Sequence, residues 1–125
     1  MGSRLPAWAT SMGRVLLAGL SATELDRVLA MSQIQAYTPH TVTDVAELKR
    51  LLAGVRADGY ACVAQELEPG LQSVAVPIVD RSGRVIAAMN VSGHANRFSR
   101  EEMLAAFLPP LRRAADQINH ALLRR

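Results

Sequence analysis

Carboxylate and thiol side chains are the first candidates for chemistry in this sequence. Glu66 and Glu68 are two positions apart, so an extended segment would project both carboxylates from one face, as acid–base catalysis requires. Because they precede the turn-forming pair Pro69-Gly70, we interpret them as solvent-facing charges. Cys62 stands among apolar residues with no histidine placed to activate it, so we interpret it as a buried, inert thiol.

The histidines and the single cysteine do not predict a metal site. His40, His94 and His120 are scattered and lack the spacing of zinc ligands, and we interpret His94 as a lone exposed histidine. The sequence contains no phosphate-binding loop and no dinucleotide fingerprint. We therefore expect no metal, no cofactor and no catalytic residue.

Two apolar runs with strand length occupy the middle of the chain. They cover residues 73–79 and 84–92, and the joint between them carries Asp, Ser and Gly, which predicts a β-hairpin. The branched residues of the first run alternate with smaller ones. We expect the core to cover the face that carries them, namely Val74, Val76 and Ile78.

Small polar residues occupy unusual positions in this hairpin. Ser73 lies on the face opposite the branched residues. Asn90 and Ser92 lie two positions apart on the second strand, which is apolar enough for us to expect cover on both of its faces. Ser73, Asn90 and Ser92 are therefore predicted to line a concavity that binds a ligand.

Helical spacing and capping signals predict the elements around the hairpin. We expect helices over residues 6–18, 21–30 and 44–58, the last two opened by a Ser or Asp with Glu three residues on. Asp58-Gly59 closes the third helix, and a strand is expected over residues 60–67. Small residues in the first helix, Ala9, Ser11 and Gly13, would let a strand or ligand approach the backbone.

A helix is also predicted from Ser99 to the C-terminus. Ser99 and Glu102 form a third capping box, followed by apolar residues at helical spacing. Pro109-Pro110 falls inside this pattern, and a proline costs about 3 kcal/mol in a helix interior. We therefore expect two helices or one sharp kink at this position.

Length and charge narrow the class of protein. A chain of 125 residues that is 50% apolar suits one domain with one core. The net charge of +3 does not predict a nucleic-acid surface, because Glu101, Glu102 and Asp116 alternate with the C-terminal arginines. With no apolar run of about 18 residues and no signal peptide, we expect a soluble cytoplasmic protein without a membrane partner.

Several motifs together resemble the effector-binding domain of IclR-type bacterial transcriptional regulators. They are the LPAxATxxGR start of the first helix, Gly59-Tyr60 at a strand start, Glu66 with Gly70-Leu71, and the AAxNxSG strand end. The chain looks most like the branch that controls aromatic-acid catabolism, the protocatechuate and 4-hydroxybenzoate regulators of the β-ketoadipate pathway. The resemblance covers essentially the whole chain.

This resemblance implies an α+β, GAF-like domain with a mostly antiparallel curved sheet flanked by helices. Such a domain binds a small organic acid and alters the DNA binding of a dimer or tetramer. Carried over residue by residue, the resemblance places the ligand against Ser11, Met12, Val63, Ser73, Asn90 and Ser92. Val63 and Ser73 stand where relatives with very small ligands use Asp and Cys, which favours a larger, partly apolar acid.

The resemblance also predicts the domain organisation. Residues 1–125 correspond to an effector-binding domain that is incomplete at its N-terminus, without the winged helix-turn-helix, so that DNA is contacted only through the missing part. Met1-Gly2-Ser3-Arg4 is then a truncation or an alternative start. An uncovered strand edge is expected to drive self-association.

Two other functions remain open from the sequence alone. One is an oligomerisation module with a vestigial pocket, which ligand screening would separate from a sensor. The other is a small hydrolase or isomerase that uses Glu66 or Cys62, although neither has a second catalytic group nearby in the pattern.

Overall fold

The computed structural model describes residues 6–123, so the expectation about Met1–Arg4 lies outside the described residues. Within this range the chain forms a short 3-10 turn, four helices and three strands. In chain order they are η1 (Ala7–Ala9), α1 (Ser11–Ala18), α2 (Ala22–Met31), α3 (Val45–Asp58), β1 (Ala61–Ala64), β2 (Leu71–Val79), β3 (Val85–His94) and α4 (Arg100–Leu123).

The three strands form one antiparallel sheet in the order β1-β2-β3. β2 and β3 make the predicted hairpin, whose turn is closed by Asp80: its carboxylate accepts hydrogen bonds from the backbone of Ser82 and Arg84. β1 ends at Ala64, earlier than predicted, because Gln65 adopts a left-handed backbone with φ of 59°.

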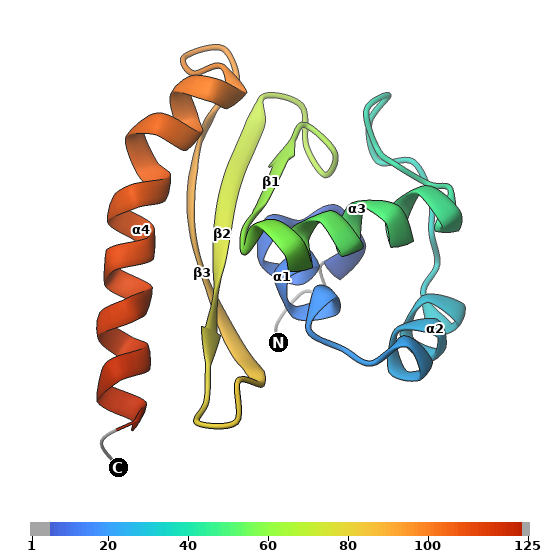
Figure 1. Cartoon of the computed structure of the whole chain (residues 1–125). Helices are drawn as coiled ribbons and strands as arrows, with labels where there is room; N and C mark the ends of the chain where they lie inside the picture. The colour runs from blue at the N-terminus through green and yellow to red at the C-terminus, as the bar shows by residue number, and fades with distance from the viewer. Residues whose placement is uncertain (1–5, 124–125) are drawn as a thin grey trace, which may run out of the picture.

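Helices cover both faces of the sheet, which confirms the α+β class (Figure 1). α4 runs along one face and packs on Val74 and Val76 of β2 through Met103, Leu111 and Ala115. On the opposite face, α1 lies against the strands and α3 packs behind it. The prediction that Val74, Val76 and Ile78 face a core is therefore confirmed.

The prediction of one helix over residues 6–18 is wrong, because the chain is extended at Thr10. The side chain of Thr10 accepts a hydrogen bond from the Gly13 amide, so Thr10 caps a new helix that begins at Ser11. The η1 turn folds back onto this helix so closely that a Cβ on Gly13 would lie 2.2 Å from the Ala7 carbonyl oxygen. Only glycine permits this contact.

The predicted helix caps have mixed outcomes. α2 begins with a complete capping box between Ser21 and Glu24. α3 begins as expected after Asp44, but the Asp44 side chain makes no capping bond, and Glu47 instead pairs with Arg50. Gly59, with φ of 75°, closes α3 in the left-handed conformation that the sequence predicted.

Of the two outcomes expected at Pro109-Pro110, the division into two helices is wrong, and the sharp kink stays a prediction. α4 is a single helix of 24 residues and is drawn as one continuous ribbon (Figure 1). The two prolines remove the hydrogen bonds that the carbonyls of Ala105 and Ala106 would accept. All four residues are exposed, so water can hydrate these carbonyls and the buried face of α4 keeps its packing.

Among the described helices, α4 is the longest, yet neither it nor any other has the apolar length that a bilayer crossing needs.

Candidate functional site

A cavity of about 390 Å³ lies between the start of α1 and the sheet. Its walls come from the η1 turn, the first turns of α1, the end of β1 with the loop that follows, the start of β2 and the second half of β3. The lining residues are Ala7, Ala9, Thr10, Ser11, Met12, Gly13, Leu16, Val63, Leu67, Leu71, Ser73, Asn90 and Ser92. The walls are mainly apolar, with a few hydroxyl groups and one amide.

Strand register brings the floor of this cavity together. Ser73 pairs with Val63 of β1 on one side and with Ser92 of β3 on the other, so these three residues form a row across the sheet. Asn90 lies two residues from Ser92 and therefore on the same face. Its side-chain amide donates to the Ser92 hydroxyl at 3.4 Å.

The start of α1 closes the cavity from above the sheet. Ser11 is 1% exposed and Ser73 is 9% exposed, and the Ser73 hydroxyl donates a hydrogen bond of 2.7 Å to the Ser11 hydroxyl oxygen. The first amides of a helix have no acceptor within it, and Thr10 accepts from that of Gly13. Among residues 6–123 the amides of Ser11 and Met12, beside the cavity, have no backbone acceptor.

β3 is less covered than the sequence predicted. Asn90 and Ser92 are exposed, although they lie on the face that α1 partly covers. α1 has only eight residues and reaches only part of this face. The cavity is therefore open toward β3 and closed toward β2.

All six residues predicted to contact a ligand line this one cavity: Ser11, Met12, Val63, Ser73, Asn90 and Ser92. Their contact with a ligand stays a prediction. Val63 is buried in the wall, whereas Met12 is 38% exposed and lies at the rim. The sequence analysis missed Thr10, Leu67 and Leu71, although a Thr just before a helix is an N-cap signal that identifies Thr10.

The interpretation of Glu66 as a solvent-facing charge is wrong, whereas Glu68 is exposed as expected. Glu66 forms an ion pair of 2.5 Å with Arg14 of α1, and both side chains are buried. The partner lies 52 residues earlier in the chain, so the local pattern around Glu66 did not contain it.

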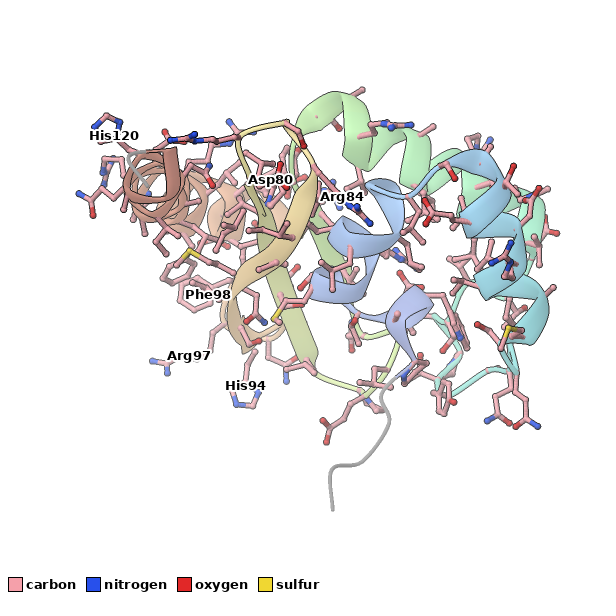
Figure 2. All side chains as sticks on the ribbon, turned by 90° about the horizontal axis from the view of Figure 1, so that it is seen from below. Asp80, Arg84, His94, Arg97, Phe98 and His120 are labelled. Carbon is pink, nitrogen blue, oxygen red and sulfur yellow. The ribbon has the colours of Figure 1, made fainter. Side chains whose placement is uncertain are left out.

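Cys62 and the histidines stay apart from the cavity. Cys62 is half-buried and not fully buried as predicted, and this burial raises the pKa of its thiol. Figure 2 shows His94 and His120 on different sides of the molecule, each pointing outward. Among residues 6–123 there is no group of His, Cys, Asp or Glu that could hold a metal ion.

Comparison with known proteins gives the family. The family described as bacterial transcriptional regulator IclR C-terminal matches residues 1–120, and the chain belongs to this family. The chain is 47% identical over 122 residues to the Pca regulon regulatory protein of Pseudomonas putida, with 98% of this chain and 42% of that protein covered. It is 36% identical to the p-hydroxybenzoate hydroxylase transcriptional activator of Acinetobacter baylyi, with 96% and 44% covered.

Solved structures agree with this family and confirm the predicted fold. A transcriptional regulator from Rhodococcus sp. RHA1 has a TM-score of 0.91 and 49% identity, with 96% of this chain and 48% of that chain covered. The inducer-binding domain of a PobR double mutant from Acinetobacter, in complex with 3-hydroxybenzoic acid, has a TM-score of 0.88 and 34% identity, with 95% and 68% covered. This chain spans less than half the length of the relatives it matches.

Proposed function

We propose that this domain binds a small aromatic acid in the cavity between α1 and the sheet, and that the bound acid controls the DNA binding of a bacterial transcriptional regulator. The observation that carries the proposal is the buried hydroxyl pair Ser11–Ser73 beside the open first turn of α1, in a cavity with apolar walls. Polar groups at one end and apolar walls around them suit an acid with a ring.

The first turn of α1 supports an acidic ligand. Its free amides and the helix dipole favour a negative group at this end of the helix. Ser73 already donates to Ser11, so the hydroxyl proton of Ser11 is left for an acceptor in the cavity. A carboxylate placed here would accept hydrogen bonds from Ser11 and from the amides of Ser11 and Met12.

The walls and the open side support the rest of the ligand. Val63, Leu67 and Leu71 offer apolar contact to an aromatic ring. Asn90 and Ser92 would supply orienting hydrogen bonds to a carboxylate or a hydroxyl. The bound 3-hydroxybenzoic acid in the PobR relative supports this ligand class.

In the whole regulator we propose that this domain is a cytoplasmic, non-enzymatic sensor. The relatives are transcriptional regulators, and their remaining length leaves room for a separate DNA-binding part. Self-association as a dimer or tetramer belongs to the proposal, and the outer edge of β3, which has no strand beside it among residues 6–123, supports it. Analytical ultracentrifugation at tens of micromolar tests this part, since a clean monomer mass contradicts it.

A thermal-shift panel tests effector binding. It compares benzoate, 3- and 4-hydroxybenzoate and protocatechuate with 4-hydroxybenzamide, which keeps the ring but lacks the carboxylate. A ligand at about a hundredfold excess over its Kd adds about 2.7 kcal/mol of stability. This corresponds to several degrees in Tm. The proposal fails if no acid raises Tm, or if the amide raises it as much as its acid.

A further inference from the structure

The ion pair between Arg14 and Glu66 does not line the cavity, but it links two segments that do. The side chains of the two residues are 5% and 10% exposed, and neither residue lines the cavity. A pair buried this deeply must keep its geometry, because separating the charges would leave each without a partner in a poorly hydrated site. Its contacts therefore decide which segments are fixed relative to one another.

Arg14 holds the η1 turn. Its Nη2 donates to Oε1 of Glu66, while its Nε donates to the Trp8 carbonyl oxygen at 2.9 Å. Trp8 lies between Ala7 and Ala9, and both alanines line the cavity. The guanidinium of Arg14 thus connects the cavity wall formed by the η1 turn to Glu66.

Glu66 reaches a different segment. Oε1 of Glu66 also accepts from the Val42 amide at 3.1 Å, and the Glu66 carbonyl oxygen accepts from the Thr41 hydroxyl. The next residue, Leu67, lines the cavity. Glu66 therefore connects the wall formed by the β1–β2 connection to residues 41–42, which lie outside the cavity.

We infer that Arg14 and Glu66 are positioning residues: together they form a clamp that sets the separation of two cavity walls and couples ligand occupancy to the segment at residues 41–42. A ligand that contacts Ala9 and Leu67 restricts both ends of the clamp. The hydrogen bond from Val42 to Glu66 then opens less often, although Val42 does not touch the ligand. The ligand part of this inference rests on the proposed function.

Two conservative variants separate the ends of the clamp. Glu66→Gln keeps the side-chain shape and one acceptor oxygen but removes the charge. Arg14→Lys keeps the charge, but a single ammonium cannot reproduce the fork that reaches both Glu66 and Trp8. The matched control is Glu68→Gln, which makes the same change at an exposed position of the same connection.

Amide hydrogen exchange without ligand is the first test. We expect Glu66→Gln to raise exchange about tenfold at Val42 and also at Ala9 and Thr10, whose amides hold the η1 turn. Arg14→Lys should affect Ala9 and Thr10 more than Val42, and the control should change none of them. Unchanged exchange at Ala9 and Thr10 in both variants would overturn the clamp. If Glu66→Gln does not melt cooperatively, Arg14→Lys decides alone.

Binding of 3-hydroxybenzoate is the second test. We expect both clamp variants to bind about tenfold more weakly by titration calorimetry, with the control unchanged. In the wild type, the acid should slow exchange at the Val42 amide, and in Glu66→Gln it should not. Equal affinity with the same protection at Val42 overturns the inference. If the wild type binds none of the acids, the proposed function fails, and the exchange measured without ligand still decides the clamp.

Discussion

The helices on the two faces of the sheet pack differently against the strands. On the α4 face, Val74 and Val76 pack directly against Met103 and Leu111. The buried Gln72 on this face donates its side-chain amide to the Phe98 carbonyl oxygen and, among residues 6–123, leaves no cavity beside it that compares with the one under α1. On the α1 face, Ser11 and Ser73 bond to each other beside a cavity of about 390 Å³. We propose that packing on the first face mainly stabilises the fold, whereas the second face binds the ligand.

Helix length accounts for much of this difference. α4 has 24 residues and runs along the strands, whereas α1 has eight and is preceded by the turn at Ala7–Ala9. Because α1 is short and capped at Thr10, its first amides lie near Ser73 of the central strand β2. α4 thus covers most of one face, whereas α1 leaves the cavity of about 390 Å³ on the other.

The largest effect is expected from removing the buried charge on the binding face. Glu66→Ala leaves Arg14 buried without its partner, which should cost about 3–5 kcal/mol of unfolding free energy. Urea denaturation measures this loss. The exposed neighbour provides the control, since Glu68→Ala should leave the midpoint almost unchanged. Equal effects of the two variants would show that the ion pair does not hold this face.

A core truncation on the opposite face should lower stability without affecting binding. Met103 is fully buried against β2, so Met103→Ala should cost about 2–5 kcal/mol. Its affinity for 3-hydroxybenzoate should stay within about twofold of that of the wild type, because distant sites without shared partners act independently. The affinity is measured under conditions in which the variant is folded. A large loss of affinity would contradict the separation of the two faces.

For Asn90 we expect a loss of affinity without a loss of stability. This residue is exposed and packs little, so Asn90→Leu should leave Tm nearly unchanged. Loss of a hydrogen bond to a charged group costs about 1.5–3 kcal/mol. That corresponds to about one to two decades in Kd, which titration calorimetry resolves. Unchanged affinity in Asn90→Leu and in Ser92→Ala would remove both residues from the proposed site.

The smallest effect is expected at the hydroxyl pair. Ser73→Ala removes one hydrogen bond from Ser11, which should lower stability by about 1 kcal/mol. The Ser11 hydroxyl then loses its fixed orientation, and the affinity for the acid should fall with it. Thermal melts with and without 3-hydroxybenzoate measure both quantities. A variant that melts and binds as the wild type does would show that the pair is incidental.

The floor of the cavity could be predicted from the sequence because it depends on local alternation. A strand with polar residues at Ser73, or at Asn90 and Ser92, shows its two faces directly. The family resemblance added Ser11, Met12 and Val63, which the alternation of polar residues in the hairpin does not identify. Strand alternation and family motifs together thus predicted six residues that line one cavity.

Two of the wrong predictions concern properties that depend on distant parts of the chain. The burial of Glu66 follows from Arg14, and no spacing rule connects residues 52 positions apart. Pro109-Pro110 does not divide α4 because both prolines face solvent, which depends on how the helix packs. The break at Thr10 differs from these two, because its capping signal is local, but Pro6 also favours a helix start and therefore predicts a single helix.

Above all, we propose that an aromatic acid binds between α1 and the sheet. Mapping amide chemical-shift changes during a titration with 3-hydroxybenzoate tests it most directly. We expect saturable changes at Ser11, Met12, Ser73 and Ser92, with the amides of α4 unaffected. Changes centred on α4, or no saturable change at the four cavity residues, would contradict the account.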